Sequence, residues 1–196
     1  MNILLATNNK HKIQEIKSIL SINNIKLFTL SDLALEIEVE EDKDTLEGNS
    51  VKKALDIFRV AKIPTVADDT GLFVPAINNE PGVFSSRYAG ESASYDDNCR
   101  KLLTRMNEID DNNRNAYFKT VVCFLIEENK HYLFEGIMKG RIIREQRGMN
   151  GFGYDPLFVP EGFDKTYAEM TEDEKNSISH RGKAFIEFRK FIMKQL

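Results

Sequence analysis

Two adjacent carboxylates, Asp68 and Asp69, are the residues of this sequence that point most directly to chemistry. They follow Thr65-Val66-Ala67, a short apolar run with the β-branched content of a buried strand, and they precede Thr70-Gly71. Ionised carboxylates are rarely buried without a partner, so two of them at a strand end indicate a cation or a reaction. Successive side chains of a strand point to opposite faces, and we therefore expect the two to do different jobs. The alternative is an Asp-Thr-Gly turn that merely closes a hairpin.

A polar turn rich in basic residues follows the first predicted strand, Asn2 to Ala6. A helical pattern with Ile13 and Ile16 on one face begins directly after Thr7-Asn8-Asn9. Threonine and asparagine are good N-cap residues, and the free N–H groups of a helix start attract anions. Lys10, His11 and Lys12 add positive charge there, so we expect an anion site; solvated surface lysines are the alternative.

An acidic run from Glu36 to Asp44 precedes a second predicted helix, whose cap is Thr45. Such a run is commonly a solvated edge, but it can also deliver one carboxylate to the same metal as Asp69. Asn49 and Lys53 lie one turn apart on this helix, so they can address one ligand together.

The most unusual loop is Gly148-Met149-Asn150-Gly151-Phe152-Gly153-Tyr154-Asp155-Pro156. Its glycines allow the backbone to approach a ligand closely or to adopt positive φ. Phe152 and Tyr154 are poor choices for an exposed turn unless they pack or stack on a flat group, and Asp155 can accept from a heterocycle N–H. The alternative is a glycine-rich turn with core-packed aromatics. Further along, Thr171 begins a capping-box pattern, and Ser179 is a plausible cap for a helix that starts near His180 and Arg181.

The chain as a whole has the composition of a globular protein. Its 196 residues carry a net charge of −4, which gives no indication of a polyanionic partner such as nucleic acid. No apolar run approaches the roughly 18 residues that span a membrane, and there is no signal-peptide pattern, so we expect a cytoplasmic protein. The alternation of predicted strands and helices indicates an α/β fold with a mixed β-sheet flanked by helices. We expect residues 1–196 to form a single catalytic domain.

Taken together, these motifs resemble the inosine triphosphate pyrophosphatase family, which removes non-standard purine nucleoside triphosphates. The resemblance runs nearly end to end. It rests on these motifs in this order: Thr7-Asn8-Asn9-Lys10-His11-Lys12, Asn49 with Lys53, Ala67-Asp68-Asp69-Thr70-Gly71-Leu72, Pro81-Gly82 with Ser85-Ser86-Arg87-Tyr88-Ala89-Gly90, Gly151-Phe152-Gly153-Tyr154-Asp155-Pro156, Glu174-Lys175-Asn176 and Ser179-His180-Arg181. The sequence departs from the family in having Gly48 directly before Asn49, where the family usually has glutamate. Glu47 lies one position earlier, so it stays an alternative to Glu40 and Glu41 as the carboxylate that completes the metal site.

The resemblance implies magnesium-dependent hydrolysis of ITP, dITP and XTP to the monophosphate and pyrophosphate. It also implies a homodimer of two-lobed chains, with the nucleotide site in the cleft between the lobes. Asp69 would be the general base and a magnesium ligand, with Glu41, or Glu40 close behind it, as the second acidic position. The substrate-binding residues would be Thr7, Asn8, Asn9, Lys10, His11, Lys12, Lys53, Thr70, Phe152, Gly153, Tyr154, Asp155, Lys175, His180 and Arg181. Among these, Lys12 would be the main phosphate cation and Phe152 would stack on the base.

Three other functions are compatible with parts of this pattern. Asp69-Thr70-Gly71 matches the triplet of aspartic proteases, although Asp68, the lysines near the helix starts and the lack of a second triplet argue against that chemistry. A related pyrophosphatase acting on modified pyrimidines or standard nucleotides would differ only in its substrates. The alternative from a different class is a non-catalytic nucleotide sensor that uses the same pocket.

Overall fold

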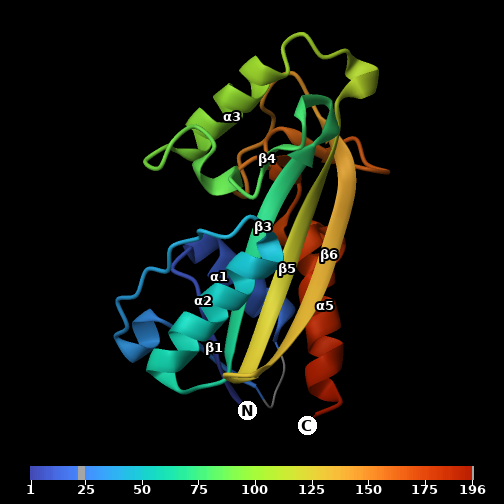
Figure 1. The fold of residues 1–196 in the computed structure, drawn as a ribbon. Helices are drawn as coiled ribbons and strands as arrows, with labels where there is room; N and C mark the ends of the chain where they lie inside the picture. Colours follow the sequence, from blue (N-terminus) through green and yellow to red (C-terminus); the bar gives the residue numbers. More distant parts are fainter. Residues whose placement is uncertain (22–24, 196) are drawn as a thin grey trace. The chain divides into compact units, whose positions relative to one another are not determined.

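The computed structural model describes residues 1–21 and 25–195. Within these residues the strands are β1 (Asn2–Leu5), β2 (Lys26–Thr29), β3 (Thr65–Val74), β4 (Glu80–Gly82), β5 (Asn115–Glu127), β6 (Lys130–Ile142) and β7 (Phe158–Pro160). The α-helices are α1 (Lys10–Ile19), α2 (Leu46–Ala61), α3 (Tyr95–Arg105), α4 (Glu172–Ile178) and α5 (His180–Met193) (Figure 1). Short 3-10 turns cover Ser31–Leu33, Pro75–Ile77, Ser85–Arg87, Asp111–Asn113 and Tyr167–Glu169. No helix of the described ranges is long and apolar enough to cross a membrane.

The strands form one mixed sheet. Its order is β2-β1-β3-β5-β6-β7, with β4 paired to β3 off this path. Strand β1 runs parallel to both β2 and β3, whereas β4 is antiparallel to β3 and β7 is antiparallel to β6. The helices α1 and α2 connect the parallel strands, as such crossovers require. This arrangement confirms the predicted α/β fold.

The described chain divides into two compact units, which agrees with the two lobes that were predicted. Unit 1 contains Met1–Asp69, Thr120–Gly136 and Arg181–Leu196, and unit 2 contains Thr70–Lys119 and Ile137–His180. The strands β3, β5 and β6 each contribute residues to both units. All the site contacts described below lie within one unit or the other.

Unit 1 has apolar cores on both faces of its strands, because alternate side chains go to opposite faces. In β3, Val66 packs in one core with side chains of α1 and α5, such as Ile16 and Phe185. The next residue, Ala67, packs in the other core with Ala54 of α2. The strand β5 alternates in the same way between the two cores. The next residue of β3, Asp68, must therefore face α1 and α5, and the one after it, Asp69, must face α2.

The structure corrects three details of the predicted elements. The Asp-Thr-Gly triplet is not a hairpin turn, because β3 continues unbroken from Thr65 to Val74. The composition of the segment from Asn78 to Glu91, with Asn78-Asn79, Pro81-Gly82 and Gly90, predicts a loop, but the segment contains the short strand β4. The sequence also predicts two strands, His131 to Phe134 and roughly Ile137 to Ile143, but these form the single strand β6, which Gly136 does not break.

Gly71 is required by a close approach within unit 2. A Cβ atom at residue 71 would lie 2.6 Å from the carbonyl oxygen of Gly82 on the paired strand β4 and 2.8 Å from the ring of Phe73. Ser85 fixes the same region, because its hydroxyl accepts from the N–H of Leu72 at 2.8 Å and donates to the Gly82 carbonyl at 2.6 Å. Glycine in this triplet therefore serves strand pairing.

Replacing Gly71 with alanine should lower the free energy of unfolding by about 1–3 kcal/mol, because the added methyl group overpacks the β3–β4 pair. Chemical denaturation measures this directly. The exposed substitution Ser92→Ala, in the same unit, is the control and should leave the midpoint unchanged. An unchanged midpoint for Gly71→Ala would show that the pair of strands can separate without cost.

Candidate active site

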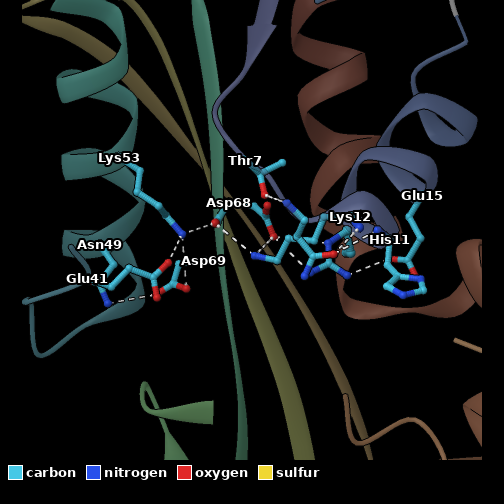
Figure 2. Close-up of polar contacts among 11 residues, drawn as sticks. Thr7, His11, Lys12, Glu15, Glu41, Asn49, Lys53, Asp68 and Asp69 are labelled. Atoms are coloured by element: carbon cyan, nitrogen blue, oxygen red, sulfur yellow. Dashed lines mark hydrogen bonds and ion pairs between the residues drawn. The ribbon is translucent and has the colours of Figure 1, made fainter. Parts of the chain in front are cut away.

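Asp68 and Asp69 point to opposite faces of β3 (Figure 2). The alternation that sends Val66 toward α1 and α5 sends Asp68 the same way, and Asp69 follows Ala67 toward α2. Both carboxylates are buried, with exposed fractions of 2% and 4%. Each must therefore be neutralised by groups on its own face, since an uncompensated buried charge is very costly. The expectation that the two aspartates point to opposite faces of the strand is confirmed, and that they do different jobs stays a prediction.

The Asp68 carboxylate is held by two cations from two helices. Its Oδ2 lies 3.0 Å from Nζ of Lys12 on α1 and 3.1 Å from Nη2 of Arg181 on α5. The guanidinium also donates to Oε2 of Glu15 at 2.7 Å, which joins α1 to α5. Burial alone would raise the pKa of Asp68, but Lys12 and Arg181 outweigh it and hold that pKa well below its usual range. Asp68 is thus held in its charged form by α1 and α5.

The Asp69 carboxylate meets the polar face of α2. Its Oδ2 accepts from the amide of Asn49 at 3.1 Å, and its Oδ1 lies 3.6 Å from Nζ of Lys53. The same ammonium is 2.5 Å from Oε1 of Glu41 and donates to the main-chain oxygen of Asp68 at 2.6 Å. Asn49 and Lys53 are buried on one side of α2, as their spacing of one turn predicted.

Asp69 is the more easily protonated of the two aspartates. Burial raises its pKa and the nearby Glu41 raises it further, whereas Lys53 lowers it. The Lys53 ammonium lies closer to Glu41 than to Asp69, so it compensates the negative charge of Asp69 only in part. For Lys53 itself, burial lowers the pKa, but Asp69 and Glu41 more than compensate and raise it. The Asp69 face therefore combines a fixed ammonium with a carboxylate that can accept a proton.

Glu41 reaches this cluster because the acidic segment is tied to the start of α2. The N–H of Lys43 donates to Oδ1 of Asn49 at 2.9 Å. Gly48 permits this approach, since a Cβ atom there would lie 2.9 Å from the Cβ of Lys43. Glu40 is exposed, and it is its main-chain oxygen that accepts from Lys52 at 2.7 Å. Of the two carboxylates predicted for the metal, the structure brings Glu41 to Asp69.

The turn before α1 differs in one respect from the prediction. Asn9 is the N-cap, and its Oδ1 accepts from the N–H groups of His11 at 3.0 Å and Lys12 at 3.2 Å. Those two amides are therefore used within the chain, and the expectation that they point freely at an anion is wrong. The hydroxyl of Thr7 accepts from the N–H of Asn9 at 3.2 Å, and Asn8 donates to the Ile37 oxygen at 3.2 Å. Lys10 and His11 are exposed.

In unit 2 the glycine-rich loop is organised by Asp155. Its Oδ2 accepts from the N–H of Phe152 at 2.8 Å and from Nζ of Lys175 at 2.6 Å. The Lys175 ammonium also lies over the Phe152 ring, 4.9 Å from its centroid. Gly151 has a φ of 73°, and a Cβ atom there would collide with the Asp155 carboxylate. The structure thus gives Asp155 a role in holding the loop and brings Phe152 and Lys175 together.

The other predicted residues of unit 2 have these surroundings. The hydroxyl of the buried Tyr154 donates to the Ser85 oxygen at 2.9 Å. His180 is buried and stacks on Phe118, with ring centroids 4.4 Å apart and an interplanar angle of 14°. The Gly153 oxygen accepts from the Cys99 thiol at 3.4 Å, and Thr70 is half-buried on β3.

The carboxylates of Asp69 and Glu41 fit a magnesium ion whose other ligands would come from the substrate and water. Among the residues described, no group of three or more His, Cys, Asp or Glu side chains is arranged to hold a metal. Magnesium, however, is commonly bound through one or two carboxylates together with substrate phosphates and water. Asp69 and Glu41 provide such a pair, and both contact the same Lys53 ammonium. The donor set is the hard oxygen type that magnesium prefers.

Comparison with known proteins identifies the family. A model described as the Ham1 family matches residues 3–191. The chain belongs to this family. It is 49% identical to a dITP/XTP pyrophosphatase of Elusimicrobium minutum (strain Pei191), in an alignment that covers 98% of this chain and 100% of that protein. It is 42% identical to a dITP/XTP pyrophosphatase of Thermoanaerobacter sp. (strain X514), in an alignment that covers 100% of this chain and 98% of that protein.

Solved structures agree with the Ham1 assignment. A HAM1 protein from Coxiella burnetii matches with a TM-score of 0.91 and 36% identity over 99% of both chains. The Staphylococcus aureus Ham1 protein matches with a TM-score of 0.88 and 34% identity over 100% of both chains. The family that the motifs resemble is confirmed.

Sequence reasoning missed two neighbours of the predicted residues. Glu15, which binds Arg181, lies three positions after Lys12 on α1, and this spacing would have placed both on one helix face. Tyr95, the first residue of α3, contacts the Phe152 ring, with centroids 5.8 Å apart. No local sequence pattern predicts the contact of Tyr95 with Phe152, because the two residues lie far apart in the sequence.

Asp68→Asn should lower the free energy of unfolding by about 3–5 kcal/mol, because it leaves Lys12 and Arg181 buried without their counter-charge. The folded-state pKa of Asp68 lies below its unfolded value, so its contribution is present above that unfolded value and is lost as the pH falls through the folded one. Urea denaturation at several pH values measures both effects.

The exposed variant Asp44→Asn is the matched control and should retain the stability of the wild type. Stability of Asp68→Asn equal to that of this control near pH 7 would contradict the anchoring role.

Proposed function

We propose that the chain hydrolyses dITP, XTP and ITP to the nucleoside monophosphate and pyrophosphate in a magnesium-dependent reaction. Membership of the Ham1 family and similarity to proteins named dITP/XTP pyrophosphatase support the reaction class. The observation that carries the proposal is the buried Asp69 with Lys53 and Glu41 on one face of β3, beside Lys12 and Asp68 on the other (Figure 2). This arrangement would supply a base, ligands for a metal ion and cations for a polyphosphate.

Asp69 and Glu41 would hold the magnesium ion, which when bound supplies positive charge to phosphate oxygens. Asp69 would also accept a proton from the attacking water, and its raised pKa suits it to that task. The water oxygen forms a bond to the α-phosphorus, and the bond from that phosphorus to the oxygen bridging to the β-phosphate breaks. Pyrophosphate then leaves, and the water proton remains on the Asp69 carboxylate.

Lys12 would be the main cation for the triphosphate. Burial lowers its pKa and Lys53 and Arg181 lower it further, while Asp68 raises it. An added anion would therefore stabilise the charged ammonium more than in an isolated lysine. Arg181 would act here through Asp68, which it holds against Lys12. Thr7, Asn8, Asn9, Lys10 and His11 surround the same helix start and complete the proposed phosphate contacts.

Phe152 and Lys175 would bind the base. A phenylalanine ring offers a flat face for stacking, which adds about 1–3 kcal/mol per base in other nucleotide sites. An ammonium can donate to a 6-keto oxygen, whereas a 6-amino group would leave that donor unpaired. Asp155 would keep the ring and the ammonium in place. The remaining proposed substrate contacts are Lys53, Thr70, Gly153, Tyr154 and His180.

Pyrophosphate release from a substrate panel tests the proposal. The substrates are dITP, XTP and ITP beside ATP, GTP, CTP and UTP, with magnesium and with chelator. We expect magnesium-dependent release from the first three, with the monophosphate as the other product. Release of orthophosphate would move the cleaved bond to the terminal phosphate. Tight binding without turnover would instead support the alternative function of a non-catalytic nucleotide sensor, which the names of the relatives do not favour.

Asp69→Asn should reduce kcat by about 10²–10⁴-fold, because the amide cannot accept the proton of the attacking water. The fold should be retained, since the amide oxygen can still accept from Asn49, while Lys53 keeps its bonds to Glu41 and to the main-chain oxygen of Asp68. Steady-state kinetics with dITP, together with thermal unfolding, separate the two effects. The control is Asp173→Asn, an exposed residue of α4 in unit 2. Activity of Asp69→Asn equal to that of this control would assign the base elsewhere.

The family resemblance also implies a homodimer, and the sequence pattern predicts a cytoplasmic location; we retain both as proposals. Light scattering of the purified chain at micromolar concentration measures the oligomeric state. A mass of two chains is expected, and the mass of one chain would contradict the dimer.

A further inference from the structure

The first turns of α3 contact the glycine-rich loop at two points and the segment just before that loop at a third, all within unit 2. The ring of Tyr95 lies against the ring of Phe152 with an interplanar angle of 49°. One residue later, Oδ1 of Asp96 accepts from the side-chain amide of Gln146 at 2.8 Å. One turn later, the Cys99 thiol donates to the main-chain oxygen of Gly153. The start of α3 therefore lies along this loop.

The Phe152 ring is contacted from outside its own loop. Its chain neighbours Gly151 and Gly153, whose φ values are 73° and 62°, carry no side chains that could pack beside the ring. The main chain at residue 152 is fixed by Asp155, but that bond to the N–H does not restrict rotation of the ring. The ring itself contacts the ammonium of Lys175 and the ring of Tyr95.

Tyr95 is not needed to build α3. The helix has a capping box, in which Ser94 accepts from the Asp97 N–H and the Asp97 carboxylate accepts from the Ser94 N–H. Its buried positions are Asn98, Cys99 and Leu102, whereas Tyr95 remains 42% exposed. Truncating Tyr95 should therefore cost little stability. The inference for Tyr95 therefore rests on its ring contact with Phe152.

We propose that Tyr95 is a positioning residue for base recognition, which holds the Phe152 ring in the orientation that stacks on the base. The inference rests on the proposed function, in which Phe152 binds the base. Tilted aromatic pairs at this separation are favourable beyond their buried area. A ring fixed before binding loses less freedom when the base arrives. Tyr95 thus strengthens substrate binding without touching the phosphates that react.

A double-mutant cycle with Tyr95→Ala and Phe152→Ala tests this inference. Tyr95→Ala should raise the KM for dITP by roughly three- to tenfold with kcat little changed, since an aromatic pair of this kind contributes about that factor. In the Phe152→Ala background the same change should have no further effect on KM. Tyr95→Phe, which keeps the ring, should restore the KM of the wild type.

The control is Phe163→Ala, which removes an aromatic ring that is 44% exposed in the same unit. It should leave KM unchanged. An unchanged KM for Tyr95→Ala would overturn the inference, as would additive effects in the cycle, because additivity means that the two rings act independently. A loss of thermal stability in Tyr95→Ala that Tyr95→Phe repairs, without a change in KM, would assign Tyr95 to the fold alone.

Failure of the proposed function is distinguishable from failure of this inference. A wild-type chain that binds dITP but releases no pyrophosphate would refute the hydrolysis. The same cycle would then be measured as dissociation constants of dITP by titration calorimetry, with the same expected factors. If Phe152→Ala alone leaves dITP binding unchanged, Phe152 does not stack on the base, and the inference for Tyr95 fails with it.

Discussion

The burial of two consecutive carboxylates on one strand is the constraint on which the site depends. Because β3 is covered on both faces in unit 1, Asp68 and Asp69 are both buried away from water, and alternation gives the two carboxylates separate close partners. Each face must supply its own cations in a region of low dielectric. The helices that flank β3 meet this demand, with Lys12 and Arg181 on one face and Lys53 on the other.

The two faces answer the constraint in different ways. Asp68 has close cations on one side chain oxygen and is held as an anion, so it stabilises the positions of α1 and α5. Asp69 shares its cation with Glu41, so its charge is less fully compensated. Adjacent residues of the same type therefore differ in how fully their charge is compensated. Their difference lies in the helices that they face.

Local patterns predicted the elements and the residue types of the site, but not all of its pairings. The strand before Asp68, the turn before Lys12 and the one-turn spacing of Asn49 and Lys53 were readable because they depend on short-range periodicity. The bond from Arg181 to Asp68 joins residues 113 positions apart, and only packing determines it. The choice of Glu41 over Glu40 depends on how Gly48 lets the acidic segment approach α2. The strand-pairing role of Gly71 was hidden because β4 was predicted as loop.

The division of labour between the two aspartates is tested most directly by anomalous diffraction from crystals grown with manganese and a non-hydrolysable dITP analogue. The account predicts a manganese peak bound by Asp69 and Glu41, with Asp68 still paired to Lys12 and Arg181. Manganese bound by Asp68, or an Asp68 carboxylate released from both cations, would contradict it.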